Sequence, residues 1–471
     1  MSRFNLRRFS ASQLLTRAHW EYSKTSLASL VKETTCCLAK YCTKKMIYVS
    51  VAVSSSVLLF VIGLSVGLSI NSFKGSDALL STPLIDGHND LPHNLYRLLN
   101  NSLDNFDFTK NLTDDKLWGK NVCKSCYTDL ARLKKGKIGA QFWVAYVDCS
   151  SQFKDAVPLT MRQIDVIKRL VAKYPNDLQF VTEAKHIEEA WNNGKIASLI
   201  GVEGGHSIDS SLAILRLYYE LGVRYMTLTH MCNTPWADAS VLDDTSVHNL
   251  TTFGEAVVYE MNRLGMLVDL AHVSHNVMRR TLSITKAPIM FSHSSAFSVC
   301  HNYRNVPDDV LHMVKKNNGI VMVNFYSNYI NCNCSRNATI QDVVDHINYI
   351  RDLIGADHVG IGADYDGVGS MPEGLEDVSK YPDLFDRIYE SDVNPKWTRE
   401  DLEKLAGRNL IRVLEAAEKV RDSLAKSEHP RQDIINQKNI YESQKSNKLQ
   451  PGLCNTAKEW IDFVKRNESR Q

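Results

Sequence analysis

Short apolar segments alternate with amphipathic segments through most of this chain. Apolar runs that end in polar or small residues recur eight times, at Pro83–Ile85, Gly139–Val147, Ile196–Val202, Tyr225–Thr229, Met266–Ala271, Ile289–Phe291, Gly319–Phe325 and Val359–Gly362. Such runs are typical of buried strands. Between them, apolar residues recur at the i, i+3, i+4 spacing of helices in Leu159–Tyr174, Ser207–Leu221, Phe253–Leu264, Ser274–Ile284 and Ile340–Leu353.

This alternation predicts one α/β domain over residues 83–420, built on a parallel sheet. Eight strand–helix units fit a (β/α)8 TIM-like barrel with some insertions. An open doubly wound sheet is the alternative, but it would more often carry a glycine-rich phosphate loop after the first strand, and none is present. The amphipathic segment Asp401–Val420 predicts a last helix, and residues 421–471 form a polar C-terminal extension.

The segment Met46–Ile70 contains no charged residue and is long enough, at about 1.5 Å per residue, to cross a bilayer as a helix. Residues 1–45 hold nine Lys or Arg and two Glu, a net charge of +7. The positive-inside rule predicts a single-pass type II membrane protein with a cytoplasmic basic tail. A short linker, residues 71–82, would then lead to an extracellular or lumenal domain. A cleaved signal peptide that starts at Met46 is the alternative.

Composition agrees with this location. The formal net charge of +2 over 471 residues argues against nucleic acid as a partner. Eight of the eleven cysteines and every Asn-x-Ser/Thr glycosylation sequon follow the apolar segment, as expected of a disulfide-bonded glycoprotein. The Cys123-x-x-Cys126 pair lacks the second pair of a zinc site, so it indicates a local disulfide or two separate ones.

Metal-binding residue types stand at the ends of the predicted strands, where the active site of a (β/α)8 barrel lies. They number seven: His88, Asp90, Glu203, His230, His272, His293 and Asp364. One catalytic zinc usually takes three protein ligands. The surplus predicts two zinc ions per chain that share a water and acidify it into a nucleophile.

Glu203 is the expected bridge between the two zinc ions, because its carboxylate has two oxygens and glycines flank it. His88 and Asp90 would complete one site, and His272 and His293 the other. Asp364 has no place among these five ligands, so we expect it to shuttle a proton.

Other polar residues near the strand ends have structural interpretations. We expect His206, His275 and His301 to be hydrogen-bonded structural residues rather than ligands. Asp269 should be a buried hydrogen-bonding partner, and Asp366 should orient Asp364 or its loop.

The sequence resembles the membrane (renal) dipeptidases of the metal-dependent amidohydrolase superfamily, from about residue 82 to 420. The motifs that carry the resemblance are Ile85–Pro92, Gly201–Ser207, Leu228–Ala237, Arg304–Asp308 and Gly362–Val368. The resemblance implies a (β/α)8 barrel with a dinuclear zinc centre and the five ligands named above. It also implies substrates that are dipeptides, cysteinyl-glycine-type conjugates including leukotriene D4, and some β-lactams.

The resemblance assigns further residues. His230 would contact the scissile group, Arg304 would hold the substrate carboxylate, and Tyr329 would line the pocket. Disulfides would form between Cys149 and Cys232 and between Cys300 and Cys332. Cys454 falls where members carry a cysteine that links a homodimer.

The chain departs from the family in two respects. Members usually have tryptophan after the Asp-Leu-Pro run, where this chain has His93. Mammalian members are held by a C-terminal glycolipid, whereas this chain is expected to use an N-terminal membrane anchor.

These observations favour a zinc-dependent membrane dipeptidase. A membrane-anchored binding protein on an inactive scaffold is the alternative, but such a pseudoenzyme would be expected to have lost a ligand. An amidohydrolase for cyclic amides or nucleobases is a further alternative, but it would have no evident need for Arg304 as a carboxylate clamp. Arg304 could also pair only with Asp308 or Asp309 on the surface.

Overall fold

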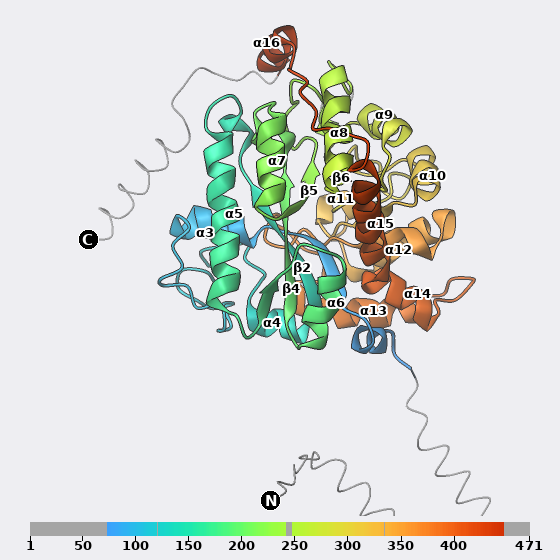
Figure 1. Cartoon of the computed structure of the whole chain (residues 1–471). Coiled ribbons are helices and arrows are strands. Elements are labelled where there is room, and N and C mark those ends of the chain that lie inside the picture. The colour runs from blue at the N-terminus through green and yellow to red at the C-terminus, as the bar shows by residue number, and fades with distance from the viewer. Residues whose placement is uncertain (1–72, 120, 242–246, 334, 447–471) are drawn as a thin grey trace, which may run out of the picture. The chain divides into compact units, whose positions relative to one another are not determined.

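The computed structural model describes residues 73–119, 121–241, 247–333 and 335–446 (Figure 1). The predicted tail 1–45, the predicted membrane helix 46–70 and Cys454 lie outside these residues. Within the described part of the chain, no helix combines the length and the apolar character that a bilayer crossing requires.

A closed parallel barrel forms the centre of the domain, as predicted. Its eight strands, in order around the barrel, are β1 (Leu84–Asn89), β2 (Ile138–Tyr146), β4 (Ile196–Glu203), β5 (Val223–Thr227), β6 (Leu267–Asp269), β7 (Met290–Phe291), β8 (Ile320–Val323) and β9 (Val359–Ile361). Each pairs with the next in parallel, and the last strand pairs with the first through Asp86 and Ile361. The strands therefore all point their carboxyl ends at one mouth.

One short strand of the sheet is not predicted by the apolar pattern. The short strand β3 (Leu178–Phe180) pairs with the first residues of β4, where Leu178 lies opposite Ile196. It extends the sheet outside the barrel ring. Three residues, two of them only half-buried, are too short for a period-2 pattern to stand out.

Helices surround the barrel (Figure 1). They are α3 (Leu91–Leu99), α4 (Leu130–Lys135), α5 (Ala156–Lys173), α6 (Lys185–Asn192), α7 (Leu212–Glu220), α8 (Thr252–Leu264), α9 (His275–Ile284), α10 (Asp308–Asn317), α11 (Ser327–Ile330), α12 (Ile340–Ile354), α13 (Tyr381–Glu390), α14 (Arg399–Glu403), α15 (Asn409–Leu424) and α16 (Gln437–Ser446). Several of them, including α5, α6, α7, α8, α12 and α15, pack directly on the barrel strands, as in other two-layer domains.

The predicted helix Ser207–Leu221 divides into two pieces. A 3-10 turn, Gly205–Ile208, is followed by Asp209 and Ser210 at φ 46° and 55°, which end it. The side chain of Ser211 then accepts a hydrogen bond from the Ile214 amide and caps α7. Local side-chain capping therefore overrides the longer apolar periodicity.

Ordered elements of the domain extend beyond residue 83 at one end and residue 420 at the other. Within the predicted linker 71–82, residues Gly75–Leu80 form a 3-10 helix whose Ala78 and Leu79 are buried, and the Ser76 amide donates to Asp386 in α13 at 2.7 Å. At the other end α15 continues to Leu424, past the predicted boundary at 420. The folded domain is therefore longer at both ends than the apolar pattern indicated.

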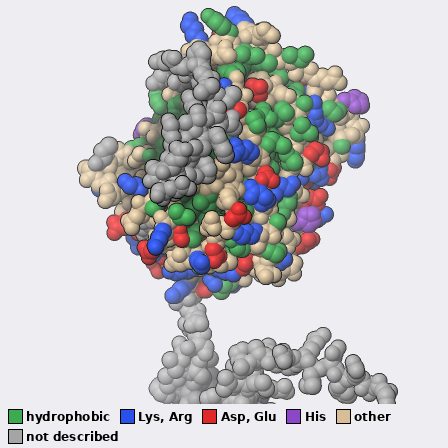
Figure 2. Space-filling view, turned by 90° about the vertical axis from the view of Figure 1, so that its left-hand side faces the viewer, with side chains coloured by type: hydrophobic (Ala, Val, Ile, Leu, Met, Phe, Trp, Pro, Cys, Tyr) green, Lys and Arg blue, Asp and Glu red, His purple; other side chains and the backbone are tan. Residues whose placement is uncertain are grey.

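The surface shown in Figure 2 mixes acidic and basic side chains. Among the described residues on this face, Lys and Arg are interspersed with Asp and Glu rather than gathered into one basic region. This face therefore offers no continuous electrostatic footprint for a polyanion.

Candidate metal centre

The predicted ligands lie together at the mouth of the barrel. Glu203 is at the centre, with its Oε1 atom 3.0 Å from His272 Nε2, 3.3 Å from His293 Nε2 and 3.5 Å from His88 Nε2. Asp90 Oδ2 lies 3.2 Å from His88 Nε2. Strands β1, β4, β6 and β7 thus bring residues distant in sequence to within contact of one carboxylate.

Three overlapping groups of these residues have the spacing of metal ligands. In each group the candidate ligand atoms lie within 4.8 Å of one another, and the groups are His88–Glu203–His293, Glu203–His230–His272 and His88–Asp90–Asp364. Glu203 belongs to two of them, and so does His88. The arrangement is therefore an extended cluster rather than one isolated triad.

A hydroxyl fixes the tautomer of His88. Its Nδ1 lies 3.0 Å from the Tyr225 hydroxyl, which itself donates to the Gly87 carbonyl at 3.1 Å. Because that hydroxyl proton is used, the oxygen accepts from Nδ1–H and leaves the lone pair of Nε2 facing the carboxylates. Gly201 makes room for Tyr225, since a Cβ there would lie 2.2 Å from the ring.

His293 is held in the same way. Its Nδ1 lies 2.7 Å from Ser292 Oγ, which donates to Asp269 Oδ2 at 2.6 Å. Asp269 also accepts hydrogen bonds from Thr227 and from the Ala271 amide. It is the buried hydrogen-bonding partner that the sequence suggested, and it leaves Nε2 of His293 directed at the cluster, 2.9 Å from His272 Nε2.

The electrostatics of the cluster suit a bound cation. Burial raises the pKa of the Asp90 and Glu203 carboxyls well above their usual range, and neighbouring carboxylates add to this. Burial also lowers the pKa of His230, His272 and His293 well below 6.5, so these imidazoles are neutral. Neutral imidazoles and crowded carboxyls are the forms that a divalent metal stabilises.

Unpartnered atoms point to the same conclusion. His88 Nε2 and Asp90 Oδ1 are buried without a hydrogen-bond partner. Buried polar atoms are rarely left unpaired, and at a metal site the ion supplies the missing partner. A set of imidazole nitrogens and carboxylate oxygens fits zinc or a similar divalent ion.

Asp364 lies beside this cluster. Its Oδ1 is 3.9 Å from His88 Nε2, and its Oδ2 accepts from Asn324 at 3.0 Å. Burial raises its pKa to about 7. Its backbone has φ 67°, and His272 has the same value. Both residues occupy a left-handed conformation that is costly outside glycine and is commonly found at functional sites.

Asp366 supports the loop that carries Asp364, as predicted. It accepts hydrogen bonds from the Tyr127 amide, from Asn94 and from the Thr128 hydroxyl. These contacts attach the β9 loop to the loop before α4, so Asp366 acts on the geometry of its neighbour and not on the cavity.

A cavity of about 370 Å³ opens over the cluster, and its lining includes Asp90, His93, Tyr146, His230, Tyr329 and Asp364. Arg304 lies in the wall behind Tyr329, with its guanidinium 5.3 Å from the centre of that ring. It donates to the Ser294 hydroxyl at 3.3 Å and to the His293 carbonyl at 3.2 Å.

Arg304 is 2% exposed, and its guanidinium forms no ion pair with any residue that the structure describes. Asp308 accepts from Ser298 and Tyr349 instead, and Asp309 pairs with Arg279. The alternative interpretation of Arg304 as a surface partner of Asp308 or Asp309 is therefore wrong.

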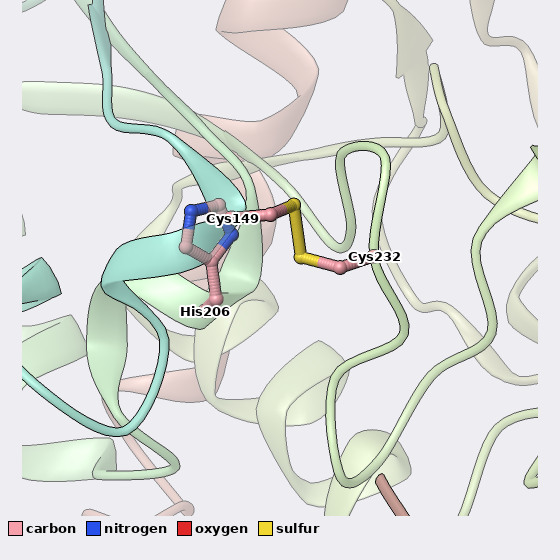
Figure 3. Close-up of side chains that lie close together, drawn as sticks. All are labelled: Cys149, His206 and Cys232. Atoms are coloured by element: carbon pink, nitrogen blue, oxygen red, sulfur yellow. A yellow bond between two sulfur atoms is a disulfide. The ribbon is translucent and has the colours of Figure 1, made fainter. Parts of the chain in front are cut away.

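Disulfides join the loops around the mouth. Cys149 after β2 is bonded to Cys232 after β5, and Cys300 to Cys332, as the resemblance implied. Figure 3 shows the ring of His206 beside the first bond. Two cysteines and a histidine suggest a metal site by type, but the sulfurs are bonded to each other. His206 Nε2 lies 2.9 Å from the Val147 carbonyl, so this histidine is structural.

The third described disulfide joins Cys123 to Cys126. The local pairing is therefore the correct one of the two alternatives left open by the sequence.

Some supporting residues were missed from the sequence. Tyr225, Ser292 and Asn324 each hold a member of the cluster by a hydrogen bond. Ser292 adjoins His293 in sequence, but no pattern indicates which hydroxyl faces which ring nitrogen. Only the strand register brings Tyr225 of β5 under His88 of β1.

A closed (β/α)8 barrel with imidazoles and carboxylates clustered at its mouth defines a metal-dependent hydrolase scaffold. The family model of membrane dipeptidase, peptidase family M19, matches residues 75–428. The chain therefore belongs to the membrane dipeptidase family.

Individual relatives agree. Dipeptidase 3 of Mus musculus is 46% identical over 344 residues, which are 72% of this chain and 65% of that protein. Dipeptidase 3 of Homo sapiens is 46% identical over 346 residues, 73% of this chain and 66% of that protein. The match thus spans slightly less than two thirds of these relatives. A solved dipeptidase described as a metallopeptidase of family M19 superimposes with a TM-score of 0.63 at 25% identity, covering 71% of this chain and 98% of that one.

Proposed function

We propose that this protein is a zinc-dependent dipeptidase that hydrolyses the peptide bond of dipeptides. The observation that supports this most is the position of Glu203, whose Oε1 atom lies within 3.5 Å of three histidine Nε2 atoms. His88 and Asp90 would hold one zinc ion, His272 and His293 a second, and Glu203 both. Zinc bound there would lower the pKa of a coordinated water to near neutrality and polarise the scissile carbonyl.

The remaining residues have roles in moving protons and placing the substrate. Asp364 would accept a proton from the attacking water and deliver it to the leaving amine, and its raised pKa of about 7 suits that exchange. His230 lines the cavity with its Nε2 4.0 Å from Glu203 Oε2, and burial keeps its ring neutral. A neutral ring can donate a hydrogen bond to the scissile group without adding charge to the site.

Arg304 would set the length of the substrate. Its fork can hold a carboxylate through two parallel hydrogen bonds, which lysine cannot copy. If that carboxylate is the C-terminus of the substrate, the scissile carbonyl lies one residue away, over the cluster. Asp90, which lines the cavity, would receive the free amine. A pocket defined at both ends accepts two residues and rejects longer peptides.

The experiment that tests this function measures metal content and peptide turnover of the full-length protein in detergent. We expect about two zinc ions per chain, turnover of Gly-Leu, and no turnover of Gly-Leu-Gly or of the C-terminal amide of Gly-Leu. Arg304→Lys should lower kcat/KM by roughly 10- to 100-fold, because one of two charge-assisted hydrogen bonds is lost. Equal turnover of Gly-Leu and its amide would refute the clamp, and full turnover after complete zinc removal would refute the metal mechanism.

Leukotriene D4, other cysteinyl-glycine-type conjugates and β-lactams are further proposed substrates. They share a carboxylate separated by one residue from an amide carbonyl, so each should compete with Gly-Leu in the same assay. Absence of competition by a given compound removes it from the substrate range without affecting the dipeptidase activity.

We also propose that Met46–Ile70 anchors the protein as a type II membrane protein and that Cys454 links a homodimer. The charge asymmetry before Met46 motivates the first proposal. An N-terminal tag on intact cells should stain only after permeabilisation, and surface staining would contradict this orientation. Cys454→Ser should abolish a dimer band on non-reducing gels, and persistence of that band would contradict the link.

A further inference from the structure

One histidine in the cavity lining is neither a candidate metal ligand nor hydrogen-bonded. His93, near the start of α3, lines the cavity over the cluster. Its ring packs edge-on against Tyr146, with centroids 4.9 Å apart, and lies 6.4 Å from the ring of Tyr96. These ring contacts hold the imidazole in place without using either nitrogen.

The two nitrogens of His93 have different surroundings. Nδ1 is buried with no hydrogen-bond partner, and no hydrogen bond is formed at Nε2 within the described residues. Only Nδ1 is sealed, so Nε2 is the nitrogen accessible at the cavity wall. A buried N–H without an acceptor is less tolerable than a buried lone pair without a donor. The favoured neutral tautomer therefore carries its proton on Nε2.

The charge state of His93 agrees with this tautomer. Burial, assisted by the nearby Arg97, lowers the pKa of His93 to about 4. The ring is then neutral at physiological pH, with one donor directed at the cavity.

The order of strands places His93 across the mouth from Arg304. His93 follows β1 and Tyr146 ends β2, whereas Arg304 follows β7. Around the barrel, β7 is separated from β1 by β8 and β9, and from β2 by β4, β5 and β6. The wall formed by His93 and Tyr146 thus lies across the mouth from Arg304.

We propose that His93 is a specificity residue that donates a hydrogen bond from Nε2 to an acceptor in the side chain of the substrate's N-terminal residue. The proposal rests on the proposed dipeptidase function and on the carboxylate end lying at Arg304. With the C-terminal residue on that side, the N-terminal side chain meets the opposite wall. Dipeptides that begin with Thr or Asn should therefore be preferred over those that begin with the similarly shaped Val or Leu.

The test compares kcat/KM for matched pairs of dipeptides in the full-length protein. For the wild type we expect Thr-Gly over Val-Gly, and Asn-Gly over Leu-Gly, by roughly 5- to 10-fold, the effect of one neutral hydrogen bond. His93→Leu should reduce both ratios to near one, and His93→Gln, which keeps a donor, should retain part of the preference. The ratio of Gly-Thr to Gly-Val should not change in any variant, because that side chain lies on the Arg304 side.

Controls separate this role from a structural one. Tyr96→Phe alters the neighbour of His93 on the same helix but not the cavity lining, so it should keep the wild-type ratios. Zinc content and thermal unfolding of the His93 variants should match the wild type.

Three results would overturn the proposal. These are unchanged ratios in His93→Leu, an equal change in the C-terminal series, or ratios in Tyr96→Phe that shift as much as in His93→Leu. If no dipeptide is turned over by the wild type, the dipeptidase function fails together with this inference. If dipeptides are cleaved but the ratios do not depend on His93, only the inference fails.

Discussion

The cluster at the barrel mouth has two unlike sides that meet at Glu203. The carboxylate side consists of His88, Asp90 and Asp364 from β1 and the β9 loop. The imidazole side consists of His230, His272 and His293 from the loops after β5, β6 and β7. Burial disfavours the charged form of the side chains on both sides. For acids and for bases this shifts the pKa in opposite directions. It raises the pKa of the carboxyls and lowers that of the imidazoles.

The support of the two sides differs correspondingly. The hydroxyl of Tyr225, which contacts His88, donates its hydrogen bond to a backbone carbonyl. The hydroxyl of Ser292, which contacts His293, donates its hydrogen bond to the carboxylate of Asp269. The chain of hydrogen bonds behind His88 therefore ends at a neutral carbonyl and the one behind His293 at a carboxylate, while Glu203 Oε1 lies near the Nε2 atoms of both histidines. The two histidines thus present the same nitrogen to the cluster but differ in the group that ends the hydrogen-bond chain behind them.

Removing the shared residue should have the largest effect. Glu203→Gln keeps the size of the side chain but removes the charge common to both sides. We expect metal content to fall on both sides and kcat/KM to fall by roughly 10³-fold or more, because several kcal/mol of transition-state stabilisation depend on bound metal. Elemental analysis and steady-state kinetics provide the measurements. Full metal content in this variant would mean that the two sides are independent.

Asp364→Asn should separate proton transfer from metal binding on the carboxylate side. The substitution preserves the shape and the contact with Asn324 but cannot accept a proton. We expect kcat to fall by roughly 10²-fold or more with unchanged metal content. A variant that loses metal in proportion to activity would instead place Asp364 among the ligands.

A matched pair of variants tests the two supports. Tyr225→Phe removes the hydroxyl behind His88, and Ser292→Ala removes the one behind His293. Each should weaken metal binding roughly 10- to 100-fold on its own side only. Titration with a chromogenic chelator should show one weakened site in each single variant and two in the double variant. Equal weakening of both sites by one substitution would contradict the division into sides.

Acid release of metal should show the smallest difference. Metal binding requires ionised carboxyls and neutral imidazoles. Because the pKa of Asp90, a ligand of the carboxylate side only, is raised well above its usual range, falling pH restores its proton early, whereas His272 and His293 resist protonation until well below 6.5. We expect stepwise metal loss on dialysis at decreasing pH, with the carboxylate side emptied first. If both metal ions were lost at the same pH, in the wild type and in Tyr225→Phe alike, the predicted difference in acid sensitivity between the two sides would be wrong.

The sequence predicts the barrel and the cluster well for the same reason. All strands of a parallel barrel end at the same mouth. A histidine or carboxylate at the end of an apolar run can therefore be placed there even when the strand register is not known. His88, Glu203 and His293 were found in this way.

Features that depend on register or on backbone conformation were not predictable from the pattern. His272 and Asp364 adopt a left-handed backbone conformation although neither is glycine, so the sequence gives no signal of it. The hydroxyls of Tyr225 and Ser292 are chosen by tertiary contacts rather than by spacing. The short strand β3 and the 3-10 helix Gly75–Leu80 are defined by packing against elements far away in sequence.

The pairing of β9 with β1 has a consequence for biosynthesis. Ribosomes make β1 first and β9 last among the barrel strands, so one edge of Leu84–Asn89 stays unpaired until almost the whole domain has been synthesised. An unpaired parallel edge is a template for aggregation, and at about 5–20 residues per second the exposure lasts many seconds. Asp364 arrives only with the strand that closes this edge. A nascent or truncated chain therefore exposes this strand edge and lacks one carboxylate of the cluster until β9 has been made.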